Sequence, residues 1–161
     1  MPIAIKDSTI DITSEKLTKE LAKEFTKYLK GGEFVFLYGE MGVGKTTFVK
    51  YFINEYQKIN NLTQSEITSP TFSLLNEYQV KDIRIKHYDL FRINRKEDIN
   101  NLDIFEKDNK LITLIEWPQL IADKQDIKFI TLTFNYLNDL NDRTVSVSYK
   151  HLLAHETSNH L

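Results

Sequence analysis

The sequence predicts a three-layer α/β fold in which a central parallel sheet is extended by antiparallel strands and carries helices on both faces. Residues 34–38, FVFLY, are apolar throughout, as expected of a strand covered on both faces, and they lead through a glycine-rich loop into a helix. Residues 111–116, LITLIE, form a second strand of this kind, which ends in a carboxylate. Alternating apolar and polar runs elsewhere indicate the antiparallel strands.

The first elements along the chain are an edge strand and an amphipathic helix. Residues 8–13, STIDIT, alternate as a short strand does. Ser14 then serves as the N-cap of a helix that ends at Gly31 and Gly32. The apolar residues of this helix recur every four positions: Leu17, Leu21, Phe25 and Leu29. After the glycine-rich loop, residues 45–57 predict a second helix.

Two hairpins are expected in the rest of the chain. The runs at 72–80 and 83–91 are rich in β-forming residues and are separated by Lys-Asp, which indicates a hairpin beside the core. The runs at 128–136 and 143–150 alternate and are joined by LNDLND, which indicates a second hairpin. Between the hairpins, residues 95–107 are expected to be helical at first and then irregular.

Length and composition indicate one globular domain over residues 1–161, with a poorly ordered tail from about residue 151. The absence of cysteine excludes disulfides, thiolate zinc sites and cysteine nucleophiles. A net charge of −2 provides no basic surface for direct contact with nucleic acid, so DNA is not an expected partner and another protein would hold any RNA. Lys6 and Asp7 precede any long apolar run, and no run could span a membrane, which predicts a cytoplasmic protein.

The glycine-rich loop is the strongest functional signal. Gly39, Gly44, Lys45 and Thr46 match G-x-x-x-x-G-K-S/T, the Walker A or P-loop motif, between a buried strand and a helix. Glycines let backbone N–H groups converge on phosphate oxygens, Lys45 supplies a positive charge, and the Thr46 hydroxyl can ligate magnesium. The expected fold is therefore that of a P-loop NTPase, with ATP and Mg²⁺ as ligands. The alternative is a glycine-rich turn with a solvated lysine.

Hydrolysis also needs an acid that places magnesium or water, usually at the end of a neighbouring strand. Glu116 ends the second buried strand, and Asp89 ends the strand at 83–91. Either carboxylate could instead be a solvated residue at a strand end. Residues 67–72, ITSPTF, resemble a nucleotide-sensing switch, although Thr71 and its neighbours could equally satisfy the backbone of a turn.

Trp117 and His87 have less specific interpretations. Trp117 is expected to be a core residue or a lid over the site. His87 is most simply a strand residue, because no second histidine or carboxylate stands at metal-ligand spacing from it.

Four stretches together resemble the TsaE (YjeE) family of bacterial P-loop ATPases: YGEMGVGKTTFVK, TSPTFSLLNEY, HYDLFRI and LIEWPQL. They occur in order between about Thr13 and Gln119. The resemblance implies a role in threonylcarbamoylation of the adenosine next to the anticodon, in tRNAs that read codons starting with A. It also implies that the protein acts on a TsaB–TsaD complex, in which TsaD transfers the threonylcarbamoyl group, and meets tRNA only through that complex.

The resemblance also implies roles for individual residues. Thr46 and Glu116 would hold magnesium, and Lys45, Glu116 and Asp89 would be catalytic, with either carboxylate orienting the attacking water. Thr71, Asp89, Trp117 and Gln119 would lie beside the nucleotide, and Ser14 would lie near the adenine. The phosphate-binding residues would be Gly42, Val43, Gly44, Lys45, Thr46 and Thr47.

This sequence departs from the family pattern at three places. Glu40 and Met41 replace the usual Asp-Leu pair, at positions whose side chains need not contact phosphate. Phe91 replaces a usual tyrosine and so removes a hydroxyl group. The usual glycine before residues 104–107 is absent, which changes a loop.

Two other functions fit parts of the sequence. A small-molecule kinase shares the loop motif, but it needs an arginine-bearing lid, and the chain has few arginines. A nucleotide-dependent switch with little turnover is harder to separate from an ATPase. The guanine-recognition motif N-K-x-D is absent, which disfavours GTP.

Overall fold

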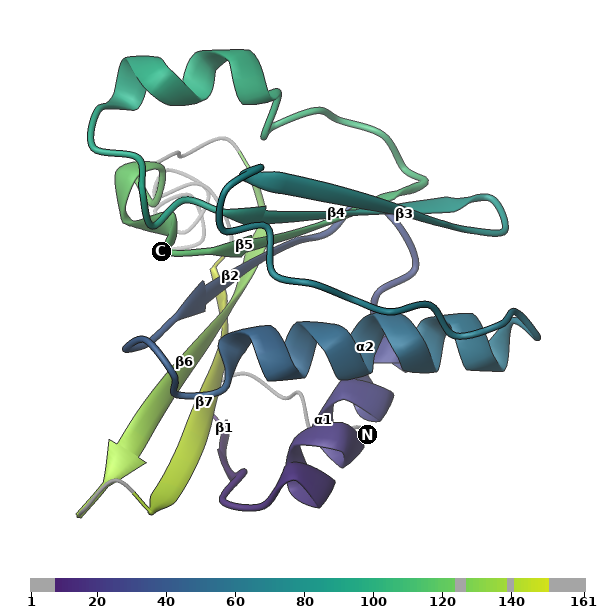
Figure 1. Ribbon diagram of the computed structural model, residues 1–161, viewed down its shortest axis with the longest axis vertical. Coiled ribbons are helices and arrows are strands. Elements are labelled where there is room, and N and C mark those ends of the chain that lie inside the picture. Colours follow the sequence, from purple (N-terminus) through teal and green to yellow (C-terminus); the bar gives the residue numbers. More distant parts are fainter. Residues whose placement is uncertain (1–7, 124–126, 139–140, 151–161) are drawn as a thin grey trace, which may run out of the picture.

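The computed structural model describes residues 8–123, 127–138 and 141–150, and their strands form one seven-stranded sheet (Figure 1). The tail from residue 151 lies outside the described residues. The elements in chain order are β1 (Ser8–Asp11), α1 (Glu15–Tyr28), β2 (Phe34–Tyr38), α2 (Lys45–Ile59), β3 (Leu75–Val80), β4 (Ile83–Asp89), the 3₁₀ helix η1 (Lys96–Leu102), β5 (Leu111–Glu116), the 3₁₀ helix η2 (Pro118–Leu120), β6 (Phe129–Leu137) and β7 (Asp142–Lys150).

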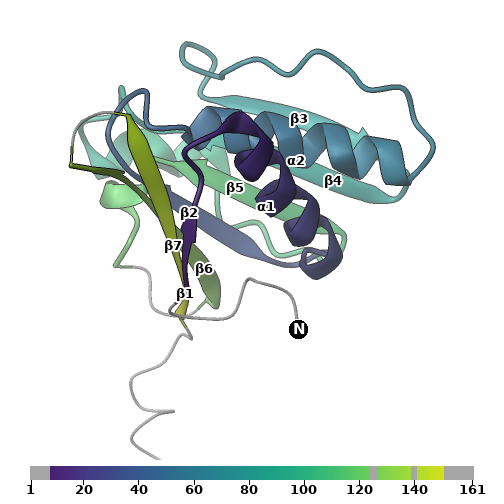
Figure 2. The same cartoon turned by 90° about the horizontal axis from the view of Figure 1, so that it is seen from below.

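The sheet has the strand order β1-β7-β6-β2-β5-β4-β3. Its centre is parallel, because β6, β2, β5 and β4 run in the same direction. The edges are antiparallel: β7 and β1 extend one side, and β3 extends the other (Figure 2). The predicted mixed sheet and both predicted hairpins are therefore confirmed.

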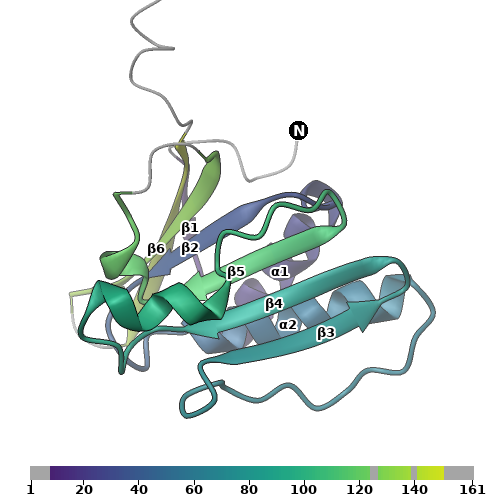
Figure 3. The same cartoon turned by 90° about the horizontal axis from the view of Figure 1, so that it is seen from above.

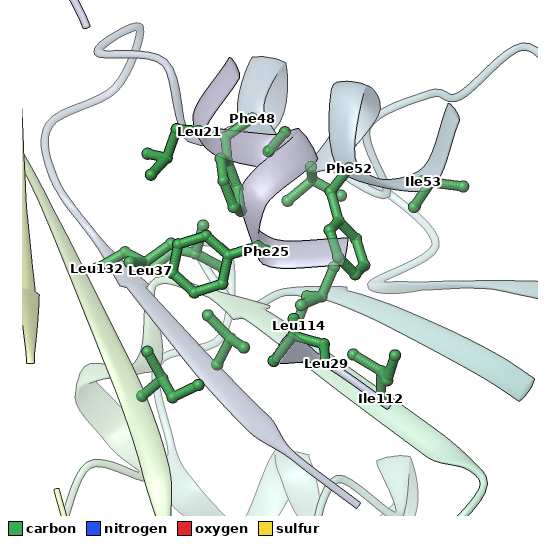
Figure 4. Packing of buried hydrophobic residues seen from close by; sticks show 14 of the residues in the cluster. Leu21, Phe25, Leu29, Leu37, Phe48, Phe52, Ile53, Ile112, Leu114 and Leu132 are labelled. Carbon is green, nitrogen blue, oxygen red and sulfur yellow. The ribbon is translucent and has the colours of Figure 1, made fainter. Parts of the chain in front are cut away.

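Helices α1 and α2 cover one face of the sheet. Their packing is aromatic: the rings of Phe25 and Phe48 meet edge to face, with centroids 5.6 Å apart, and Phe52 lies beside Phe48 (Figure 4). Leu37 and Leu114 of the two central strands close this core from the sheet side. As predicted, the Ser14 side chain caps α1, where its oxygen accepts a hydrogen bond from the Leu17 N–H at 3.3 Å.

The opposite face is covered by η1, η2 and the loops around them (Figure 3). A second apolar cluster lies here and includes Phe36, Tyr88 and Ile115. The helical start expected at 95–107 is present, but it is a 3₁₀ helix with no buried residue, and Asp103 ends it in a left-handed conformation. Two of its apolar side chains, Ile99 and Leu102, are partly buried against this cluster. Short helical segments of this kind often take the 3₁₀ form.

None of the helices in the described ranges is long and apolar enough to cross a membrane.

The aromatic core predicts a large loss of stability for Phe25→Ala. Phe25 is fully buried, so removing its ring should lower the free energy of unfolding by about 3–5 kcal/mol in urea denaturation. Phe72→Ala is the matched control, because that ring is 82% exposed and its loss should change stability by less than about 0.5 kcal/mol. Equal losses in the two variants would contradict the assignment of the core.

Candidate functional site

The loop between β2 and α2 is built on glycines that adopt positive φ angles. Gly39, Gly42 and Gly44 have φ angles of 146°, 83° and 122°, which residues with a Cβ rarely adopt. A Cβ on Gly39 would lie 2.8 Å from Val43 Cγ1 and 2.9 Å from the Phe134 carbonyl oxygen. Helix α2 begins at Lys45, so its free N–H groups and the positive end of its dipole belong to this loop. These features make the loop suitable for binding an anion.

Lys45 lies within the loop instead of extending into solvent, and it is only 4% exposed. Its Nζ donates to the carbonyl oxygens of Gly39 and Glu40 and lies 3.8 Å from the centroid of the Trp117 ring. Burial lowers the pKa of Lys45, and the nearby charges of Glu116 and Asp89 oppose that shift. Lys45 is therefore held inside the loop by carbonyl oxygens and the Trp117 ring, beside the helix N-terminus that suits an anion.

The two predicted carboxylates lie side by side. Strands β4 and β5 are parallel and pair Asp89 with Glu116, so both carboxylates lie at the carboxyl end of the sheet. Glu116 is 2% exposed, and the Thr46 hydroxyl lies 3.0 Å from each of its carboxylate oxygens. Thr46 and Glu116 are thus in direct contact, although 70 positions separate them in the chain.

His87 is a component of the site that the sequence analysis did not identify. It is fully buried, and its Nε2 lies 2.6 Å from Glu116 Oε2. Among the described residues, its Nδ1 has no hydrogen-bond partner, so the hydrogen bond of this ring is the one with Glu116. The available signal was the spacing of His87 and Asp89, since residues two apart on a strand point to the same face.

Asp89 faces the same space. One carboxylate oxygen accepts a hydrogen bond from the Phe91 N–H at 3.0 Å. Burial raises the pKa of Asp89 and outweighs that hydrogen bond, and Glu116 raises it further, whereas His87 and Lys45 lower it. A carboxyl with a raised pKa beside a phosphate loop is a candidate for proton handling or for orienting water.

A pocket of about 380 Å³ opens between the loop and the ends of β4 and β5. Most of the predicted site residues line it: Gly42, Gly44, Lys45, Thr46, Thr47, Thr71, Asp89, Glu116 and Trp117. The structure adds four lining residues that the sequence analysis did not propose for nucleotide contact: Met41, Ser69, Phe91 and Arg92. The pocket volume is within the range of small-molecule binding sites.

Three predicted residues lie outside the pocket lining. The Val43 side chain is fully buried, which leaves its backbone as the part available to a ligand. Ser14 is occupied as the N-cap of α1, and Gln119 is an exposed residue of η2. Their predicted contacts with nucleotide stay predictions.

Aromatic and hydroxyl side chains complete the pocket wall. Trp117 has a φ of 58°, a left-handed conformation that costs a residue with a side chain about 1–3 kcal/mol. Its ring packs against Phe91, with centroids 4.8 Å apart. Ser69 and Thr71 also line the pocket, and their hydroxyls are hydrogen-bonded to each other at 2.8 Å.

The oxygen ligands fit magnesium bound together with a nucleotide. In the part of the chain that the structure describes, no group of three or more histidine, cysteine or acidic side chains could hold a metal ion. Mg²⁺ in nucleotide sites usually takes one or two protein oxygens and completes its shell with water and phosphate. The adjacent oxygens of Thr46 and Glu116 match that pattern.

Comparison with known proteins identifies the family. The model of the family described as "Threonylcarbamoyl adenosine biosynthesis protein TsaE" matches residues 12–145, which include every residue of the pocket lining. The chain belongs to the TsaE family. The resemblance noted in the sequence is therefore confirmed.

Relatives named TsaE occur in bacteria of several genera. The chain is 36% identical to the protein of Rickettsia typhi over 142 residues, which cover 88% of this chain and 95% of the relative. It is 37% identical to that of Aquifex aeolicus over 108 residues, covering 67% and 74% of the two chains. The solved structure of Bacillus subtilis YdiB has a TM-score of 0.65, with 22% identity and 94% coverage of both chains, which supports the fold.

The loop geometry predicts that Gly39→Ala destabilises this member of the TsaE family more than Gly32→Ala does. Both glycines have positive φ, so a Cβ at either should cost about 1–2 kcal/mol. Only at Gly39 does the Cβ also meet backbone and side-chain atoms below 3.0 Å, which should add about 1–3 kcal/mol. Urea denaturation of both variants tests this, and equal losses would contradict the tight packing of the loop.

Proposed function

We propose that this protein binds and hydrolyses ATP in tRNA threonylcarbamoyladenosine biosynthesis. The observation that carries the proposal is the direct contact of Thr46, in the phosphate loop, with Glu116, at the end of the neighbouring strand. A loop motif alone can bind phosphate, whereas hydrolysis needs an acid at this second place. Family membership supports the pathway.

In this proposal the residues divide into three groups. Lys45 and the N–H groups of residues 42–47 bind the β- and γ-phosphates. Thr46 and Glu116 hold Mg²⁺, which would neutralise phosphate charge when it binds with ATP. Glu116 already contacts Thr46 and His87, which favours the metal role for it and leaves Asp89 to orient the attacking water.

The proposed partner is a TsaB–TsaD complex, and tRNA is met only through it. The net charge of −2 gives the chain little attraction for RNA of its own, which supports an indirect role. ATP hydrolysis would reset or activate the complex and would not supply the transfer chemistry. The proposal includes a cytoplasmic location.

Nucleotide binding should depend on Lys45. Lys45→Ala removes the positive charge that lies in the loop, so we expect Mg-ATP affinity to fall by at least about 100-fold in calorimetric titration. Lys50→Ala is the matched control, because Lys50 is an exposed residue of the same helix and should leave affinity unchanged. Unchanged affinity in Lys45→Ala would exclude the proposed phosphate site.

Hydrolysis should depend on Glu116 and on the partners. Glu116→Gln keeps the size of the side chain but loses the charge, so we expect at least about a 100-fold lower kcat with ATP still bound.

Turnover by the wild type should rise when TsaB, TsaD and tRNA are added. A rate that is indifferent to these partners would leave the nucleotide site intact and exclude the proposed pathway role. A faster transfer of phosphate to a small acceptor than to water would instead indicate a kinase.

A further inference from the structure

Arg92 is a cationic residue of the pocket that the proposed function leaves without a role. It lies three residues after Asp89, in the segment between β4 and η1, and lines the same pocket as Lys45 and Glu116. Backbone hydrogen bonds fix this segment against the end of β5: the Leu90 N–H donates to the Glu116 carbonyl oxygen at 3.1 Å, and the Ile93 N–H donates to Leu90. The position of Arg92 is therefore tied to the strands that carry both carboxylates.

The interactions of Arg92 differ from those of the other arginines in the chain. Arg84 and Arg95 form ion pairs with carboxylates, and Arg143 donates to backbone oxygens of Thr13 and Val43. In the described ranges, no carboxylate lies within ion-pair distance of Arg92. Its guanidinium carbon lies instead 4.5 Å from the centroid of the Phe72 ring. A cation on an aromatic face keeps its N–H donors available for a ligand.

A second positive side chain in the pocket would balance the charge of its two carboxylates and of a bound nucleotide. Among the lining residues, the acidic side chains are Asp89 and Glu116, and the basic ones are Lys45 and Arg92. Mg-ATP is itself an anion, so without Arg92 the nucleotide and two carboxylates would face a single lysine. In phosphoryl transfer, negative charge on the phosphate oxygens is stabilised by cations placed in advance.

We propose that Arg92 is a catalytic residue that stabilises the γ-phosphoryl group of ATP during hydrolysis, and that Phe72 positions its guanidinium. This role rests on the proposed ATPase function. In the reaction, the water oxygen bonds to the γ-phosphorus while the bond from that phosphorus to the β–γ bridging oxygen breaks. The electron pair of the broken bond stays with ADP, and the water proton passes to inorganic phosphate or solvent. The arginine thus acts from within the chain and needs no partner subunit.

Phe72 links this arginine to the loop that carries Thr71. Phe72 is 82% exposed, which is unusual for a large apolar side chain, and the guanidinium carbon of Arg92 lies 4.5 Å from its ring centroid. The loop itself is held by a hydrogen bond from the Asn76 side chain to the Thr68 carbonyl oxygen at 3.1 Å and by the Ser69–Thr71 pair. A displacement of this loop would therefore also move the support of Arg92.

The test compares Arg92→Ala and Arg92→Lys with Arg95→Ala. Arg95 is a matched control, because it lies in the same segment, is exposed, pairs with Asp98 and does not line the pocket. For Arg92→Ala we expect kcat to fall by at least about 100-fold, while affinity for ADP stays within about threefold. Arg92→Lys should restore part of the rate, and Arg95→Ala should match the wild type.

A binding measurement provides a readout other than turnover. Aluminium fluoride with ADP mimics the transferring phosphoryl group, so the wild type should bind ADP at least about tenfold more tightly in its presence. Arg92→Ala should lose this gain. Phe72→Ala should lose part of this tightening and lower kcat by about three- to tenfold. Phe72→Tyr retains the ring, so it should keep the tightening and kcat of the wild type.

Two results would overturn the role of Arg92. One is an Arg92→Ala variant that keeps both the wild-type kcat and the tightening by aluminium fluoride. The other is a variant that weakens ADP and ATP equally with kcat unchanged, since that would show simple binding. A wild type that binds no nucleotide would instead remove the proposed function itself, and with it the reason for a catalytic arginine.

Discussion

The site depends on one buried carboxylate, that of Glu116. Removing a carboxyl group from water costs free energy unless polar partners surround it. Here the partners come from two other elements, Thr46 of α2 and His87 of β4. Packing α2 onto the sheet therefore satisfies the carboxylate and, by the same contacts, brings the phosphate loop to the acid. The same contacts stabilise the fold and assemble the site. A substitution of Glu116, Thr46 or His87 is therefore expected to change both the free energy of unfolding and the geometry of the site.

Parallel strand pairing explains why the other residues converge. Strands β2, β5 and β4 end at the same edge of the sheet, so the glycine loop, Glu116 and Asp89 meet there although they are distant in the chain. The antiparallel strands β1, β7 and β3 contribute no lining residue of this pocket, and only the segment before β3, with Ser69 and Thr71, reaches it. Ligands of open α/β sheets bind at this edge for the same reason.

Much of this arrangement could be predicted from local signals. The all-apolar strands, the Ser14 cap and the glycine spacing each depend on neighbouring residues, and the loop motif placed Thr46 in the site. His87 was missed because its partner belongs to another strand, and the contact follows from register, which a single strand does not specify. Arg92 was missed for a related reason: its position is set by backbone bonds to β5. The 3₁₀ form of η1 was not predicted, because a helical residue pattern does not specify the hydrogen-bond spacing of so short a helix.

The position of Lys45 over Trp117 links the phosphate loop to the intrinsic fluorescence of the protein. Trp117 is the single tryptophan of the chain, and the lysine ammonium lies over its ring. The emission of an indole depends on charges near its ring, so we expect a ligand that draws Lys45 away from Trp117 to change the intrinsic fluorescence. The eight tyrosines absorb at longer wavelengths only weakly, and excitation near the red edge of the absorption band isolates this one ring. Occupancy of the phosphate loop should therefore be measurable in the unlabelled protein, from its one tryptophan.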